Sequence, residues 1–240
     1  MKIVVDPSFS QLTDYISRIP TMFQRGEGEL VYDKRNSVAR FNHAGLTLIV
    51  KRFKRVNFIQ QIVYSFFRQS KAERAFQFAE IFRERGIDTP QRVAYMEQRR
   101  GGLFSVGYFV SLESVGTETH LLLREVQNFS PELADAVANQ VVLMHSRGIL
   151  HGDLNLSNFL CQETGGGYHF TMIDINRSHF TDGWPTEKQC MENLVRLTHR
   201  RDLYDYLVRS YARQRDWDED ATARRALKLL ERFENRRIRL

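Results

Sequence analysis

The stretch HGDLNLSNFL, residues 151–160, places one histidine, one aspartate and two asparagines between apolar residues. Such polar residues either cap a tight turn or form a site that acts on a ligand. Asp153 and Asn158 lie five residues apart, and Asp174 follows after two short apolar runs that flank the sequence TGGG. This pattern predicts a β-hairpin, which would bring Asp174 back beside Asn158 and Asp153.

Two carboxylates and an amide oxygen in one place are hard ligands of the kind that Mg²⁺ prefers. If Asn158 and Asp174 hold Mg²⁺, Asp153 is left to accept a proton from, or to orient, a hydroxyl group. Taken singly, these residues are ordinary turn formers. His151 is expected to brace the loop backbone near Asp174 rather than to react. The joint spacing favours a nucleotide site.

The surrounding sequence predicts a small sheet lobe followed by a helical lobe. Three short β-rich runs form a meander, a helix from about Ser70 to Arg85 ends at Gly86, and two further runs form a second hairpin. We expect five strands with one helix inserted after the third. The β-rich runs are 29–33, 37–41, 46–53, RVAYMEQ and LFSVGYFVSLES.

Helical patterns dominate from about Val115. Ser130 and Pro131 begin a helix that Gly148 ends, directly before His151, and the chain from Pro185 onward is also predicted to be helical. The predicted division is an N-terminal, nucleotide-binding lobe over residues 1–113 and a C-terminal, catalytic lobe over residues 114–240, together forming one α+β domain. Ligands commonly bind between two such lobes.

The spacing of His151, Asp153, Asn158 and Asp174 matches the catalytic loop and metal-binding Asp of protein kinases. In that pattern Asp153 is the catalytic residue, and Asn158 and Asp174 bind Mg²⁺. A protein kinase also carries a phosphate-binding lysine on its third strand. Lys51 fits this position, because strand alternation places it on one face with Thr47 and Ile49. Lys54 is a weaker candidate, since the strand should already have ended.

The chain resembles the lipopolysaccharide core kinases, the Kdo/heptose kinase family of the protein-kinase-like superfamily. The resemblance covers about residues 29–200 and is carried by VKRFKR, SKAERAF, RERGIDTPQRVAYME, LMHSRGILHGDLNLSNFL and MIDINRSHF. It implies a two-lobed kinase fold with ATP between the lobes, and transfer of its γ-phosphate to a sugar hydroxyl of the core saccharide. It also implies action at the cytoplasmic face of the inner membrane, and backbone contacts to adenine near Glu113, mainly through its carbonyl.

Several positions depart from the kinase pattern. DKRNS replaces the glycine-rich loop; backbone amides could still cap the phosphates there, and Lys34 or Arg35 could reach them. Asp174-Ile175-Asn176 replaces Asp-Phe-Gly, and Asn155 stands where protein kinases have a phosphate-contacting lysine. Either Glu73 or Glu80, or neither, would pair with Lys51. The chain after Asp174 is too short for a full activation segment, which argues against protein substrates.

The composition limits the class of protein and of partner. The chain has 240 residues, 42% of them hydrophobic, and a formal net charge of +6. This charge favours an anionic partner, namely nucleic acid, an acidic lipid surface or a phosphorylated substrate, or else the basic surface serves only solubility. The core saccharide that the resemblance implies is also anionic. No nucleic-acid-reading motif is present, so a nucleic-acid partner is disfavoured. With two cysteines and neither a signal sequence nor a long apolar run, we expect a cytoplasmic protein.

Other hypotheses stay open. The acceptor could be a small molecule or a protein, or the chain could be a weakly active kinase-fold nucleotide sensor. Phe58, Ile62 and Phe66 recur at helical spacing and are expected to pack within the lobe, the alternative being an amphipathic helix at a membrane interface. The oligomeric state is not predicted.

Overall fold

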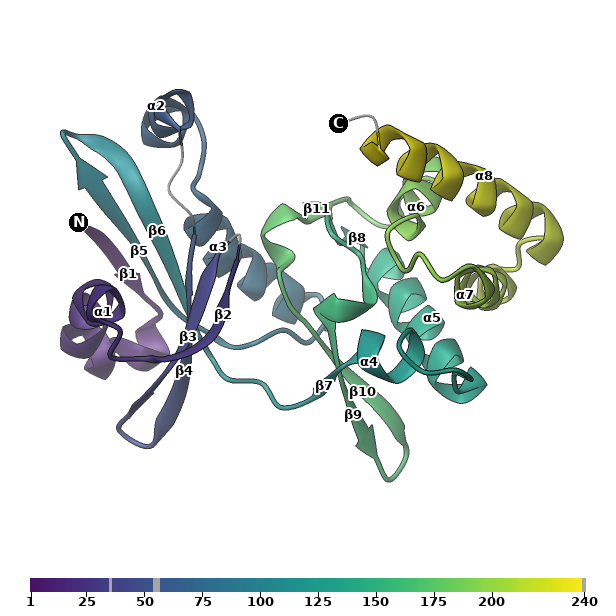
Figure 1. Cartoon of the computed structure of the whole chain (residues 1–240), viewed down its shortest axis with the longest axis horizontal. Helices are drawn as coiled ribbons and strands as arrows, with labels where there is room; N and C mark the ends of the chain where they lie inside the picture. Colours follow the sequence, from purple (N-terminus) through teal and green to yellow (C-terminus); the bar gives the residue numbers. More distant parts are fainter. Residues whose placement is uncertain (35, 54–56, 239–240) are drawn as a thin grey trace. The chain divides into compact units, whose positions relative to one another are not determined.

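The computed structural model divides the chain into two compact units and describes residues 1–34, 36–53 and 57–238. The N-terminal unit comprises Met1–Arg83 and Pro90–Ser114, and the C-terminal unit comprises Glu84–Thr89 and Val115–Leu240. Figure 1 labels the elements of both units. Arg35 and Lys54, two of the candidate phosphate ligands, lie outside the described residues.

A six-stranded antiparallel sheet forms the centre of the N-terminal unit, in the order β1-β5-β6-β4-β3-β2. Five of the strands confirm the predicted meander and second hairpin. The strand at the start of the chain is an addition: its short run KIVV pairs with β5. The strands are β1 (Lys2–Val5), β2 (Glu29–Asp33), β3 (Ser37–His43), β4 (Leu46–Arg52), β5 (Arg92–Arg100) and β6 (Leu103–Leu112).

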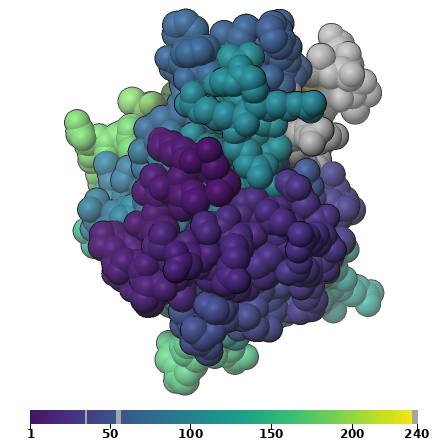
Figure 2. Space-filling model, turned by 90° about the vertical axis from the view of Figure 1, so that its left-hand side faces the viewer, coloured from purple at the N-terminus to yellow at the C-terminus, as the bar shows by residue number. Residues whose placement is uncertain are grey.

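The N-terminal segment covers one face of this sheet. It consists of η1 (Pro7–Leu12) and α1 (Thr13–Arg25), and Figure 2 shows it spread over this face of the molecule. Ile16 and Ile19 of α1 are fully buried against Leu48 and Val50 of β4 and against alternate residues of β5 and β6. The sequence analysis assigns neither element, and Pro20 inside α1 argues locally against a helix. Burial of an apolar helix face outweighs that local cost.

Helix α3 (Lys71–Glu84) packs against the other face of the sheet, opposite the face that α1 covers. It confirms the predicted helix: the Ser70 hydroxyl accepts a hydrogen bond from the Glu73 N–H at 3.1 Å, and Gly86 follows with φ +73°. Its buried face meets Phe53 and Tyr95 through Ala72, Ala75 and Phe76.

Helix α2 (Phe58–Phe66) lies over β6 and has no buried residue. Its inner side is held by Ser65, whose hydroxyl accepts from the Phe104 N–H at 2.8 Å. The expectation that Phe58 and Phe66 pack in the core is wrong, because 65% and 67% of these residues are exposed. None of the helices within residues 1–34, 36–53 and 57–238 is long and apolar enough to span a bilayer.

The C-terminal unit is mainly helical. Helix α5 (Pro131–Ser146) begins at the predicted cap, where Ser130 accepts from the Leu133 N–H at 3.1 Å, and it leads into the HGD loop. The predicted hairpin around TGGG and the helical C-terminal segment are also present. The other elements are β7 (Thr117–Glu118), α4 (Thr119–Leu123), β8 (Ile149–Leu150), η2 (Leu156–Asn158), β9 (Phe159–Thr164), β10 (Gly167–Met172), η3 (Ile175–Arg177), β11 (His179–Phe180), α6 (Glu187–Leu194), α7 (Arg201–Gln214) and α8 (Glu219–Ile238).

Candidate active site

The β9–β10 hairpin brings the three candidate residues of the C-terminal unit together. Its register pairs Phe159 with Met172, and one residue further along the Ile173 N–H donates to the Asn158 carbonyl at 3.0 Å. Asp174 therefore follows directly after the residue that is paired with Asn158. The Asn158 amide in turn donates from Nδ2 to the Asp153 carbonyl at 2.7 Å.

His151 ties the two sides of this site to each other. It is fully buried, its Nδ1 accepts from the Asp153 N–H at 3.2 Å, and its Nε2 lies 3.0 Å from the Ile173 carbonyl. These partners require a neutral ring with the proton on Nε2. Burial lowers the pKa of His151, which keeps the ring neutral. These contacts fit the bracing role expected from the sequence.

Asp174 has a left-handed backbone conformation, with φ +56° and ψ +40°. Aspartate and asparagine adopt this region more readily than most other residues. Asn176 donates from Nδ2 to Asp174 Oδ1 at 2.6 Å, which fixes the direction of the carboxylate. The asparagine that replaces the glycine of Asp-Phe-Gly therefore acts as a local support for the acid.

Gly152 permits a close approach between the HGD loop and the segment after Asp174. A Cβ atom at Gly152 would lie 1.9 Å from the Arg177 carbonyl oxygen and 2.4 Å from its carbon. Both are main-chain atoms, so no side-chain movement could relieve the contact. The loop geometry requires glycine at this position.

A chain of hydrogen bonds, centred on the buried His145, supports the HGD loop from within the C-terminal unit. Asn193 donates from Nδ2 to the His151 carbonyl at 2.7 Å, and His145 Nε2 lies 3.1 Å from Asn193 Oδ1. His145 Nδ1 lies 2.8 Å from the Tyr211 hydroxyl, which accepts from Arg215 at 2.7 Å. Burial lowers the pKa of His145 to about 4, so it is neutral and relays these bonds. None of these supporting residues could be recognised from the sequence, because His145, Asn193 and Tyr211 lie in three different helices and Arg215 follows α7.

Arg196 is the cation that faces the candidate catalytic carboxylate. Its Nη1 lies 3.6 Å from Asp153 Oδ1, and its guanidinium lies 5.0 Å from the centre of the Phe233 ring on α8. The side chains of Arg196 and Asp153 are 39% and 31% exposed, so solvent screens this pair and its contribution to stability is small. The sequence carries no local signal for this pairing.

The donor set in the C-terminal unit fits Mg²⁺. Asn158 uses its amide nitrogen to contact Asp153, which leaves the amide oxygen as its ligand atom, and Asp174 supplies a carboxylate. Mg²⁺ commonly takes one or two such groups and completes its shell with phosphate oxygens and water. No cluster of three or more His, Cys, Asp or Glu side chains that could hold an ion occurs among the described residues.

Lys51 lies in β4 of the N-terminal unit, opposite Phe109 of β6 and on the face of the sheet that α3 covers. Its Nζ is 5.6 Å from the centre of the Phe53 ring. The two glutamates considered as its partners contact other groups. Glu73 accepts from Lys2 at 3.1 Å and from the Tyr95 hydroxyl at 3.0 Å, and Glu80 pairs with Arg92 at 2.8 Å.

Glu113 follows the β5–β6 hairpin, and both its side chain and its main-chain N–H form hydrogen bonds within the protein. Its carboxylate accepts from Arg40 Nε and Nη2 at 2.8 and 2.6 Å, and its N–H donates to the Thr47 carbonyl at 2.9 Å. The main-chain carbonyl is the polar group that these contacts leave for a ligand. Its contact with adenine stays a prediction.

Comparison with known proteins identifies the family of this chain. The model of the lipopolysaccharide kinase (Kdo/WaaP) family matches residues 25–223, which is most of the chain and includes the hairpin and the HGD loop. The chain belongs to this family. Membership in the Kdo/WaaP family confirms the relationship predicted from the catalytic-loop residues.

Named relatives of this Kdo/WaaP chain include two curated 3-deoxy-D-manno-octulosonic acid kinases, from Vibrio vulnificus strains YJ016 and CMCP6. Each is 27% identical over 161 residues, or 63% of this chain, and the chain spans 64% of the length of these relatives. A solved structure, WaaP in complex with acyl carrier protein, aligns with a TM-score of 0.63 at 19% identity over 98% of both chains. This likeness confirms the predicted α+β, protein-kinase-like fold.

Proposed function

We propose that the protein is an ATP- and Mg²⁺-dependent phosphotransferase that phosphorylates a Kdo or heptose hydroxyl of the lipopolysaccharide core. The observation that carries the proposal is the grouping of Asp153, Asn158 and Asp174 around the β9–β10 hairpin. Family membership and the two named Kdo kinases support a sugar acceptor.

Asp153 would accept the proton of the sugar hydroxyl, or orient that hydroxyl, as its oxygen bonds to the γ-phosphorus. The bond between the γ-phosphorus and the bridging oxygen breaks, and ADP leaves. Asn158 and Asp174 would hold Mg²⁺, which supplies neutralisation of phosphate charge when bound. His151 and Asn193 keep the Asp153 backbone in place during the transfer.

In the N-terminal unit, Lys51 is assigned to the α- and β-phosphates of ATP and the Glu113 carbonyl to adenine. Two features support the Lys51 assignment: its place in β4 and its position on the sheet face that α3 covers. With the glycine-rich loop absent from the sequence, Lys51 would supply positive charge to the phosphates alongside Lys34 or backbone amides of the DKRNS stretch.

Peripheral contact with an anionic membrane at the cytoplasmic face is part of the proposal, and α2 is the element assigned to it. Phe58, Ile59, Phe66 and Phe67 are between 65% and 81% exposed, which is unusual for large apolar residues. The Phe58→Ser/Phe67→Ser variant should cosediment less with phosphatidylglycerol vesicles than the wild type. Leu121→Ser, at a residue 49% exposed on α4, is the control, and equal loss in both variants contradicts the assignment.

The central test is Asp153→Asn, with Asp182→Asn as the control at an exposed aspartate of the same unit. Phosphate transfer from ATP to a Kdo-containing acceptor should fall by about 10² to 10⁴-fold in Asp153→Asn. Binding of a non-hydrolysable ATP analogue should survive. Equal turnover in both variants contradicts the catalytic role. A nucleotide-induced rise in melting temperature without turnover on any acceptor favours the nucleotide sensor instead.

A further inference from the structure

A basic groove lies between α6 and α8 of the C-terminal unit, and its lining does not include Lys51, Glu113, Asn158 or Asp174, which bind nucleotide or metal in the proposal. Its volume is about 650 Å³, within the range of small-ligand sites. Among the described residues that line it, Glu192 is the only acidic one. The basic residues that line it are Lys188, Arg196, Arg225, Lys228, Arg232 and Arg236.

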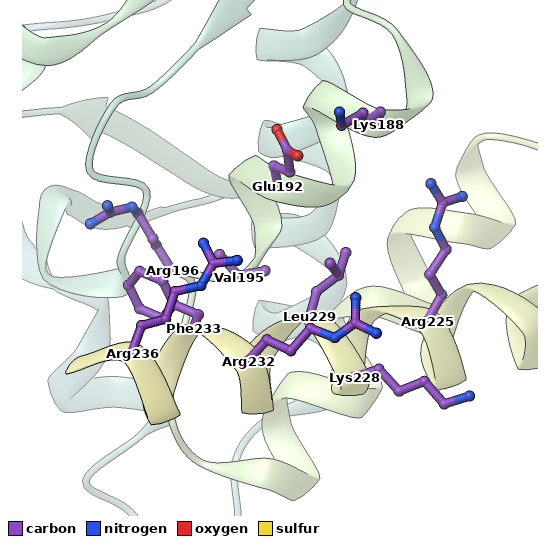
Figure 3. A pocket seen from close by; sticks show the side chains of 10 residues that line it. All are labelled: Lys188, Glu192, Val195, Arg196, Arg225, Lys228, Leu229, Arg232, Phe233 and Arg236. Atoms are coloured by element: carbon purple, nitrogen blue, oxygen red, sulfur yellow. The ribbon is translucent and has the colours of Figure 1, made fainter. Parts of the chain in front are cut away.

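The spacing of these residues places their charge on the walls of the groove. Positions 225, 228, 232 and 236 recur at intervals of three and four along α8, so they share one helix face. Figure 3 shows the guanidinium groups of Arg225, Arg232 and Arg236 extending from α8 on the side that faces α6. Part of the basic C-terminal sequence ENRRIRL is thereby directed into a concave surface.

Most of this charge is not neutralised by the protein. Arg225 pairs with Glu187, and Arg196 makes the 3.6 Å contact with Asp153. No carboxylate of the residues that the structure describes lies within salt-bridge distance of Arg232 or Arg236. Like charges held side by side destabilise a helix, so an unneutralised row of this kind indicates an anionic ligand.

Arg196 connects the groove with the candidate catalytic residue. It lines the groove, contacts Phe233 of α8, and faces Asp153 on its other side. A molecule that presents a hydroxyl to Asp153 would therefore extend its remaining groups past Arg196 into the groove.

We propose that the α6–α8 groove binds the acidic part of the acceptor, namely the carboxylate and phosphate groups of a phosphorylated Kdo glycolipid. Arginine forms paired hydrogen bonds with both groups. This inference rests on the proposed function for the identity of the acceptor. The test therefore measures binding without ATP and without turnover.

The probe is diphosphorylated lipid A carrying one Kdo residue, dispersed in neutral detergent, and it is compared with the same glycolipid after removal of both phosphates. The variants are Arg232→Glu and Arg236→Glu in the full chain. Arg224→Glu is the matched control, because Arg224 is an exposed arginine of α8 outside the groove. Melting temperature checks that each variant is folded.

Each groove variant should bind the diphosphorylated probe about tenfold more weakly than the wild type. The probe affinity of Arg224→Glu, and the affinity of every variant for a non-hydrolysable ATP analogue, should change less than twofold. Dephosphorylation of the probe should reduce wild-type binding and narrow the difference between the variants and the wild type, because only the Kdo carboxylate is then left to contact the arginines. The inference stands if this holds even where no phosphate transfer is found.

Three results overturn it. The first is an equal loss in Arg224→Glu and Arg232→Glu, which would mean a general effect of charge. The second is an equal loss of binding to phosphatidylglycerol vesicles that lack the glycolipid, which would mean a membrane-docking surface. The third is unchanged glycolipid binding together with lost binding of an acidic carrier protein.

Discussion

Asn193 Nδ2 lies 2.7 Å from the His151 carbonyl, and its Oδ1 lies 3.1 Å from His145 Nε2. One side chain from α6 thus satisfies both a main-chain acceptor of the HGD loop and a buried donor of α5. His145 and His151 are fully buried, so loss of the half-buried Asn193 side chain would leave polar groups of both residues without a protein partner.

Asn193→Ala should therefore lower stability and activity together. It leaves the His151 carbonyl and the His145 Nε2–H unsatisfied, at a cost of about 1–3 kcal/mol for each group. Urea unfolding should show a lower midpoint, and kcat should fall more than KM for ATP rises. Asn235→Ala, at an exposed position of α8, should leave both quantities unchanged. An unchanged unfolding midpoint in Asn193→Ala would refute this role.

Gly152→Ala should disrupt the loop, because its Cβ would overlap the main chain of Arg177. We expect a loss of at least several degrees in melting temperature and loss of phosphate transfer. Gly165→Ala is the matched control, since no heavy atom lies within 4 Å of a Cβ at that position in the hairpin turn. If both variants melt alike, the close approach is not what requires glycine.

Substitution of Asp174 separates metal binding from backbone strain. Asp174→Asn keeps a residue that tolerates the left-handed region but removes the negative charge. The Mg²⁺ concentration that half-saturates binding of an ATP analogue should rise at least tenfold, with little change in melting temperature. Asp174→Ala should show the same Mg²⁺ effect and an added destabilisation of about 1 kcal/mol. If both variants show the Mg²⁺ dependence of the wild type, the assignment of Asp174 as a metal ligand is wrong.

Stability should decrease as the pH falls from 6.5 to 4, because of His145. Burial lowers its pKa to about 4 in the folded protein, whereas the unfolded chain takes up the proton near pH 6.5. The unfolded state therefore binds more protons in this range, and the free energy of unfolding falls by up to about 3 kcal/mol near pH 4. His145→Gln should lose less stability than the wild type between pH 7 and pH 4.5 in urea unfolding. The exposed control His179→Gln should follow the wild type.

Local spacing was sufficient to predict the elements that hold the site. The HGD loop, the hairpin and the helix before them are close in sequence, and each carries its own cap or turn residues. Strand β1 and helix α1 could not be assigned from the sequence. The four-residue strand depends on pairing with β5, and the helix, which contains Pro20, depends on packing against the sheet.

The site could likewise be predicted only in part, because some of its residues come from distant parts of the sequence. Asn193 and Arg196 act on the loop from the far end of α6 and beyond it, and nothing in their own neighbourhood marks them as part of the site. The exposed side of α2 was also mispredicted, since helical spacing of Phe58 and Phe66 does not reveal whether a partner covers them.

Glu73 connects the first turn of α3 to two strands at the edge of the sheet. Its carboxylate receives Lys2 from β1 and the Tyr95 hydroxyl from β5, which are neighbouring strands. A rotation of α3 away from the sheet would break both contacts at once, and β1 would lose its ion pair in the same step. The position of α3 and the pairing of the first strand are thereby coupled through one carboxylate, so a change at Lys2 is expected to be felt at the start of α3.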